Sequence, residues 1–130
     1  MQRRPAWPRD LDRPKLLAAG EDWDVVRVPA DVGMRAVRDL EARGVPVGPV
    51  LHDSCNGQAY FLTPPGTAQE WQQDGTQALG SGSWVVLAPP GWRGLLRWLH
   101  DPADGPAHTL TDDLAESLVA AVVTGEDAEG

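Results

Sequence analysis

GQAYFLTPPGTAQEW at residues 57–71 and GSGSWVVLAPPGW at residues 80–92 each place a short apolar run directly before a Pro-Pro-Gly unit. Proline has no backbone N–H to donate and holds φ near one value, so strand pairing cannot continue through two consecutive prolines. The runs themselves are rich in valine, leucine and aromatic residues, which strands favour. We therefore predict two strands with sharply defined ends, at residues 58–63 and 84–87.

Four further segments show short apolar runs bounded by turn residues, the usual signature of strands. They are WDVVRV at residues 23–28, VPVGPVLHD at 45–53, GTQAL at 75–79 and LLRWLH at 95–100. The turn residues SCNG at 54–57 separate the second of these from the strand at 58–63. We expect those two strands to form a hairpin.

Two segments carry apolar residues at helical spacing. They are ADVGMRAVRDLEARG at residues 30–44, with Met34, Val37 and Leu40 on one face, and TDDLAESLVAAVV at 111–123, with Leu114, Leu118, Ala121 and Val122 on one face. TAQEW at 67–71 is long enough for a single helical turn. Runs of strands with a few helices predict an α+β fold, here a mainly antiparallel sheet with two main helices packed on one side.

The chain has 130 residues, enough for one domain with a hydrophobic core. Residues 1–20 are rich in Arg and Pro and predict a flexible basic arm with a short helical piece at 14–20. Residues 21–123 form the predicted single domain, and residues 124–130 a frayed acidic tail.

The net charge of -8 is unevenly distributed, because residues 1–15 carry +3 by residue count and the rest of the chain carries the acidic excess. Duplex DNA binding requires many basic side chains against the phosphates. The charge therefore argues against strong duplex binding by the body of the domain and leaves only the arm for it.

No apolar run is long enough for a membrane span, and the N-terminus lacks the apolar stretch of a signal peptide. A single cysteine, Cys55, cannot form an internal disulfide, as expected in a reducing compartment. These features predict a cytoplasmic protein without a membrane partner.

HDSC at residues 52–55 is the one local cluster of candidate ligands or nucleophiles. His52, Asp53 and Cys55 lie at the predicted hairpin turn. A zinc site needs four ligands, and the chain offers only His100 and His108 as further histidines and no second cysteine. We therefore predict neither a metal nor another cofactor, and interpret the three residues as polar turn residues with a possible residual site among them.

The six tryptophans are candidates for stacking on a planar ligand. Trp23 and Trp84 lie in predicted strands and are expected in the core. Trp92 and Trp98 lie near the second Pro-Pro and are the better surface candidates. HDPADGPAH at 100–108 reads as a solvated polar loop.

Taken together, GQAYFLTPPG at 57–66, GTQALGSGSWVVLAPPG at 75–91 and LLRWLHDP at 95–102 resemble the N-terminal domain of bifunctional DNA primase/polymerase (prim-pol) proteins, a branch of the archaeo-eukaryotic primase superfamily. The likeness spans about residues 45–100. The preceding WDVVRVPADVGMRAV unit, the single lysine and the absence of isoleucine make the chain look like a reduced, actinobacterial form of that domain.

The resemblance also implies that the family's catalytic residues are lost. The family's nucleotide-binding histidine falls at Ala59, and its later acidic metal ligand falls at Gln77. Its Asp-x-Asp motif has only His52-Asp53 in its place. Two-metal nucleotidyl transfer needs several carboxylates to hold the ions. The resemblance thus implies a catalytically degenerate primase/polymerase-like domain with a binding or regulatory role, linked to DNA replication.

In such a role, Arg3, Arg4, Arg9 and Arg13 would contact phosphates, and Trp92, Arg93 and Trp98 would form a stacking face. The acidic body equally suits a protein-protein interaction module without any nucleic-acid function. A residual enzyme using His52, Asp53 and Cys55 is the third and least favoured interpretation. The sequence identifies no particular partner.

Overall fold

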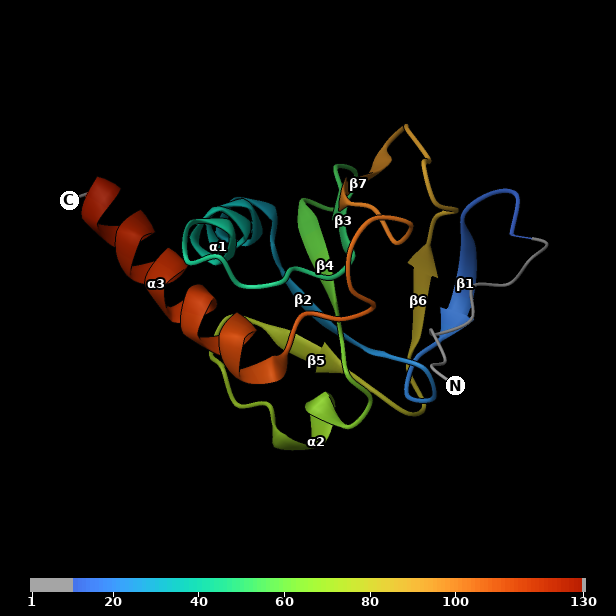
Figure 1. Ribbon diagram of the computed structural model, residues 1–130, viewed down its shortest axis with the longest axis horizontal. Helices are drawn as coiled ribbons and strands as arrows, with labels where there is room; N and C mark the ends of the chain where they lie inside the picture. The colour runs from blue at the N-terminus through green and yellow to red at the C-terminus, as the bar shows by residue number, and fades with distance from the viewer. Residues whose placement is uncertain (1–10, 130) are drawn as a thin grey trace.

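The central layer of the computed structural model, which describes residues 11–129 with side chains as far as residue 123, is a five-stranded antiparallel sheet of order β5-β2-β4-β3-β7. A two-stranded sheet, β1-β6, forms a second layer, and two long helices form a third (Figure 1). The predicted α+β fold with a mainly antiparallel sheet is confirmed. The elements are β1 (Lys15–Ala18), β2 (Asp24–Pro29), α1 (Ala30–Ala42), β3 (Val50–Asp53), β4 (Gln58–Thr63), α2 (Thr67–Glu70), β5 (Gln77–Leu79), β6 (Trp84–Leu87), β7 (Leu96–His100) and α3 (Thr111–Glu129).

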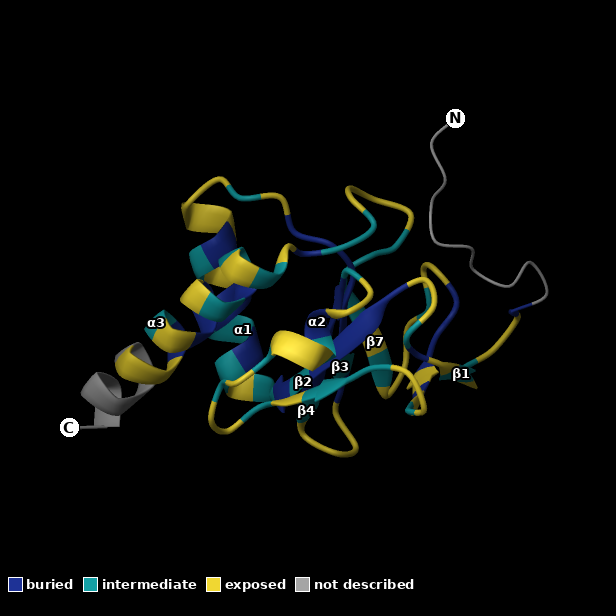
Figure 2. Ribbon diagram, turned by 90° about the horizontal axis from the view of Figure 1, so that it is seen from below, coloured by how far each residue is buried: buried dark blue, intermediate teal, exposed yellow. Residues whose placement is uncertain are grey.

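Both long helices cover one face of the large sheet, as the sequence predicts. Val26, Phe61 and their neighbours project from this face of β2 and β4 against Leu40 of α1 and Leu114 of α3, and all four are fully buried. Figure 2 shows the central strands in the colour of buried residues, with the outer surfaces of the helices exposed. Burial of apolar side chains at about 25 cal/mol per Å² is the main force that holds these layers together.

The other face of the large sheet is covered by the β1-β6 ribbon. Alternate residues of β2 and β4, such as Val25 and Leu62, pack here against Leu87 of β6 and against Trp23. The prediction of a short helical piece at residues 14–20 is wrong, because Lys15–Ala18 pairs antiparallel with Trp84–Leu87. Pairing with a distant strand overrides the weak local helical preference, so the ordered part of the chain includes residues that the sequence assigns to the flexible arm.

The predicted hairpin is confirmed as β3-β4, with Leu51 opposite Tyr60. In contrast, β5 and β6 follow each other in the chain but join different sheets, because β5 pairs with β2 and β6 pairs with β1. The Gly/Ser turn at residues 80–83 carries the chain from one layer to the next.

Both Pro-Pro-Gly units form the same turn. Thr67 N donates to Pro64 O at 3.2 Å, and Trp92 N donates to Pro89 O at 3.1 Å. The glycine at the third position of each turn has a positive φ, 96° at Gly66 and 78° at Gly91. Proline at the second position and a positive φ at the third define a type II turn, which only glycine enters without strain. The repeated motif therefore ends β4 and β6 by the same backbone chemistry.

The predictions for Trp23, for Trp84 and for the end of the last helix have different outcomes. Trp23 is buried, as expected, with 5% of its surface exposed, but the prediction of a core position for Trp84 is wrong, since its side chain is 61% exposed. Trp84 alternates along β6 with the buried Val85 and so lies on the exposed face of the β1-β6 ribbon. The last helix continues to Glu129, past the predicted end at residue 123. Within the described residues, no helix is long and apolar enough to cross a membrane.

Candidate functional site

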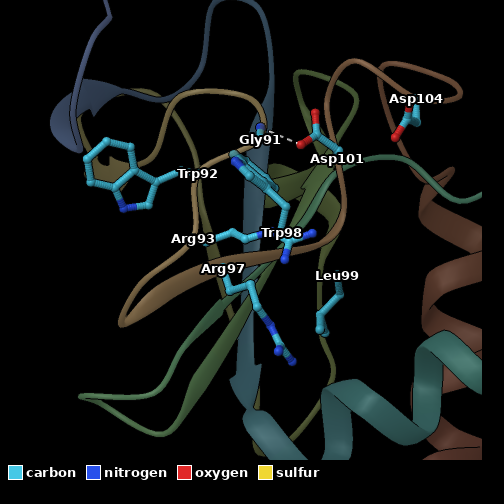
Figure 3. A pocket seen from close by; sticks show the side chains of 8 residues that line it. All are labelled: Gly91, Trp92, Arg93, Arg97, Trp98, Leu99, Asp101 and Asp104. Carbon is cyan, nitrogen blue, oxygen red and sulfur yellow. Dashed lines mark hydrogen bonds between the residues drawn. The ribbon is translucent and has the colours of Figure 1, made fainter.

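The second Pro-Pro-Gly turn and the end of β7 together enclose a cavity of about 460 Å³ (Figure 3). Its size is within the usual range for ligand pockets. It is lined by Gly91, Trp92, Arg93, Arg97, Trp98, Leu99, Asp101 and Asp104. The turn supplies the first three of these residues, and β7 with the loop that follows it supplies the rest.

Two hydrogen bonds hold the turn and β7 together. Trp98 Nε1 donates to Pro89 O at 2.9 Å, which fixes the indole ring against the turn. Gly91 N donates to Asp101 Oδ2 at 2.5 Å, which ties the tip of the turn to the residue that follows β7. Buried and partly buried indoles that satisfy their N–H in this way have few alternative orientations. These two bonds therefore fix the position of the Trp98 ring and of the turn relative to β7.

β7 is an edge strand of the large sheet, and this position explains why neighbouring residues reach the same cavity. Side chains of successive strand residues point to opposite faces. Trp98 packs against the core on the β1-β6 side, whereas Leu99 packs against the core on the helix side. At an open edge, residues of both faces can border one solvent-accessible hollow, so Arg97 and Trp98 both line it.

The cavity contains two uncompensated positive charges. Arg93 and Arg97 are both exposed, and within the described residues neither guanidinium forms a salt bridge or a hydrogen bond. A guanidinium presents five N–H donors in a planar arrangement that matches phosphate and carboxylate groups. Two free guanidinium groups beside two indole rings suit a ligand that combines a planar aromatic ring with an anionic group.

The sequence names three residues of this cavity, Trp92, Arg93 and Trp98, and the structure brings all three together. The sequence analysis does not identify Arg97, Asp101 or Asp104 as candidates. Asp101 and Asp104 belong to the polar loop read as solvated, and nothing in their local pattern indicates that this loop folds back to the Pro-Pro-Gly turn. Arg97 directly precedes Trp98 on the same strand, which is the one signal that could have identified it.

The arm arginines do not line this cavity as far as the structure describes them. Arg13 is exposed, and its Nε lies 3.8 Å from Asp12 Oδ1. Arg3, Arg4 and Arg9 lie outside the described residues.

A second cavity, of about 330 Å³, is lined by residues of the β1-β6 ribbon and of the large sheet, and Asp53 and Cys55 both border it. His52 is not part of it, because His52 and Asp53 are neighbours on β3 and project to opposite faces of the sheet. Cys55 is exposed and forms no disulfide. The predicted residual site is therefore not assembled as a group, since only two of its three members share a cavity.

Asp53 forms a buried hydrogen-bonded unit with Tyr60 and Asn56. Its Oδ2 accepts from Tyr60 Oη at 2.9 Å and from Asn56 Nδ2 at 2.7 Å, and its Oδ1 accepts from Asn56 N at 3.2 Å. Burial alone would raise the pKa of Asp53, but these bonds, together with one from the Cys55 backbone, stabilise the carboxylate and lower the pKa below 3.8. Burial and the neighbouring carboxylate raise the pKa of Tyr60 to about 12. Both carboxylate oxygens of Asp53 and the hydroxyl group of Tyr60 are therefore already hydrogen-bonded within this unit.

The two remaining histidines form contacts that join elements of the fold. His100 Nε2 lies 2.8 Å from Glu41 Oε2, at the end of α1, and His108 Nε2 lies 2.9 Å from Asp22 O. Among the described residues, no three His, Cys, Asp or Glu side chains gather closely enough to hold a metal ion.

Comparison with protein-family models, with curated protein sequences and with solved structures gave no match for this chain.

Proposed function

We propose that this chain is a non-catalytic binding domain, a reduced relative of the primase/polymerase domain, that binds single-stranded nucleic acid at the cavity of Trp92, Arg93, Arg97 and Trp98. The observation that carries the proposal is that two indole rings and two guanidinium groups without a hydrogen bond or salt bridge among the described residues line one hollow. Nucleic-acid bases stack on aromatic side chains, and each stacked base contributes about 1–3 kcal/mol.

Single strands suit this site better than duplexes. A base can enter a cavity and stack on an indole only when it is not already paired and stacked in a helix. The acidic body, with eight acids and no bases from residue 101 onward, repels the dense charge of a duplex. In this proposal the arginines of the arm, Arg3, Arg4, Arg9 and Arg13, add phosphate contacts outside the cavity.

The motif likeness to prim-pol domains supports a link to DNA replication, and the loss of the family's histidine at Ala59 and acid at Gln77 supports a role in binding or regulation. Both remain parts of the proposal. A nucleotide-incorporation assay with manganese should give no signal, and a signal that disappears in Asp53→Ala would instead establish catalysis.

The proposal is tested by fluorescence anisotropy with a labelled single-stranded oligonucleotide and its duplex at low salt. The full chain should bind the single strand more tightly than the duplex. Arg93→Gln/Arg97→Gln removes both guanidinium groups from exposed positions and should weaken binding at least about tenfold, by analogy with the cost of losing charge-assisted hydrogen bonds.

Arg38→Gln is the matched control, because Arg38 is an exposed arginine on α1, away from the cavity, and its loss changes the net charge in the same direction. It should leave binding nearly unchanged. Absence of affinity for both nucleic acids at low salt would refute the proposal.

A protein-protein interaction module is the second candidate function, and one observation favours it. Four large apolar side chains border the second cavity while remaining exposed, which is uncommon for a protein of this size without a partner. They are Leu16 at 58%, Trp84 at 61%, Val86 at 43% and Leu95 at 67% exposure. The acidic charge of the chain favours a basic partner over a second copy of itself.

Trp84→Ser/Leu95→Ser tests this second function, because both positions are exposed and the change should not disturb the core. A basic partner that binds the purified chain should lose its affinity for the double variant. Val119→Ser, an exposed valine on α3, is the control. Equal binding of the double variant and the control would eliminate this face as the interface.

A further inference from the structure

The charges in the Trp92–Asp104 cavity are separated along its length. Figure 3 shows Arg93 and Arg97 on one side of the Trp98 ring and Asp101 and Asp104 on the other. For a nucleotide bound as proposed above, this separation of charge would favour one orientation. Its phosphate would lie toward the guanidinium groups, because the carboxylates repel it, and its base would extend past Trp98 toward the carboxylates.

The carboxylates of Asp101 and Asp104 differ in whether their oxygens already accept hydrogen bonds. Asp101 is occupied by the backbone, since its Oδ2 accepts from Gly91 N at 2.5 Å and its Oδ1 accepts from Ala103 N at 2.8 Å. The side chain of Asp104 is exposed and accepts no hydrogen bond within the described residues, while its own backbone N donates to Asp101 O at 3.0 Å. Asp101 therefore shapes the loop, and Asp104 is the free acceptor.

A free carboxylate distinguishes the bases by the donors they present. An ionised carboxylate only accepts hydrogen bonds, and its two oxygens can accept two parallel N–H groups at once. Guanine carries such a pair side by side, N1–H and the N2 amino group. Adenine and cytosine present one amino group beside a ring nitrogen acceptor, which the carboxylate repels, and thymine presents one N–H between two carbonyl oxygens.

We propose that this cavity selects guanine in single-stranded nucleic acid and that Asp104 is the specificity-determining residue. The inference rests on the proposed function, because it assigns the base that the same cavity accepts. A correct two-point contact of this kind typically discriminates between bases by about 1–3 kcal/mol, which corresponds to a range from about fivefold to over a hundredfold.

The test measures the affinity of the full chain for four thymine oligonucleotides that differ at one central position. The central base is guanine, hypoxanthine, adenine or thymine, and hypoxanthine is guanine without its N2 amino group. We expect guanine to bind at least about tenfold more tightly than thymine or adenine, with hypoxanthine in between, because one of the two donors is missing. This comparison requires no variant and so does not depend on the folding of one.

Asp104→Ala then assigns the preference to a residue. It should reduce the ratio of guanine to thymine affinity to about twofold or less through a loss of guanine affinity, while the affinity for the thymine oligonucleotide does not fall. Asp74→Ala is the matched control, because Asp74 is an exposed acid at a different cavity and its loss changes the net charge equally. It should keep the full preference for guanine.

The two possible failures are distinguishable. If all four oligonucleotides bind equally well, or if Asp104→Ala retains the guanine preference, the inference is wrong and the proposed function stands. If none of them binds, the proposed function is wrong and the inference falls with it.

Discussion

Tyr60 Oη lies 2.9 Å from Asp53 Oδ2, and both side chains are buried between the large sheet and the β1-β6 ribbon. The two residues come from adjacent strands of the predicted hairpin, β4 and β3. This hydrogen bond stabilises the protonated form of the phenol, which donates, and the ionised form of the carboxylate, which accepts. The pair therefore links the protonation of the protein to its stability at both ends of the pH scale.

On the alkaline side, Tyr60 should titrate near pH 12. Its raised pKa stabilises the fold fully below pH 10, and this contribution is lost as the pH rises from 10 through about 12. Tyr60 is the only tyrosine in the chain, so its tyrosinate absorbance can be followed without interference from another tyrosine. Asp53→Asn should shift the midpoint toward 10. An unshifted midpoint in that variant would show that Asp53 does not hold the phenolic proton.

On the acidic side, Asp53 should contribute stability that acid removes. Because its pKa in the folded protein lies below 3.8, its contribution is present above pH 3.8 and is lost as the pH falls through the lower, folded value. The free energy of unfolding of Asp53→Asn should therefore approach that of the natural chain as the pH falls below 3.8. Urea unfolding at a series of pH values measures this difference, and a gap that does not narrow would contradict the assignment.

Gly48→Ala should destabilise the protein by about 1–3 kcal/mol. A Cβ at this position would lie 2.3 Å from the carbonyl carbon of His108, and Gly48 N also donates to Thr109 Oγ1 at 2.9 Å, so the backbone has little room to move. Thermal and urea unfolding measure the change. Gly94→Ala is the control, because its nearest contact would be an ordinary 3.5 Å to Trp92 Nε1, and it should change stability by less than about 0.5 kcal/mol.

Ser117→Ala should cost about 1.5–3 kcal/mol, the usual value for a hydrogen bond to a charged group. Ser117 is fully buried between α1 and α3, where its Oγ donates to Asp39 Oδ2 at 2.7 Å and accepts from Arg43. Glu116→Ala removes only an exposed partner, 3.3 Å from Arg43, and should cost less than about 1 kcal/mol. Equal urea midpoints for the two variants would show that the Asp39–Ser117 bond does not hold the helices together.

The salt dependence of the oligonucleotide affinity should report how many arginines contact phosphate groups. With the two arginines of the cavity and the four of the arm, log K against log salt should have a slope of about -4 for single strands, since each contact contributes about -0.7. Replacing Arg3, Arg4, Arg9 and Arg13 by glutamine should reduce the slope to about -1.4. A slope that these four changes leave unaltered would place the arm outside the interface.

Local chemistry made most of the elements predictable. Each Pro-Pro-Gly ends its strand because proline cannot donate and glycine alone accepts the positive φ of a type II turn, and these are properties of three consecutive residues. The helix over 30–42 and the last helix as far as residue 123 follow from apolar spacing that any window of the sequence displays, whereas the continuation of the last helix to Glu129 was not predicted. The same holds for Trp92, Arg93 and Trp98, which their residue types and their place after the second Pro-Pro-Gly marked as candidates for a stacking face.

The sequence by itself thus determined most of the strands and helices, because turns and periodic faces depend on neighbouring residues. Only the tertiary structure decided which strands pair, because pairing joins residues far apart in the chain, such as Leu17 with Val85. That pairing made Lys15–Ala18 a strand and turned Trp84 outward, while the alternation of side chains along β3 separated His52 from Asp53. It also folded the loop of Asp101 and Asp104 against the turn of Gly91, which no local pattern could indicate.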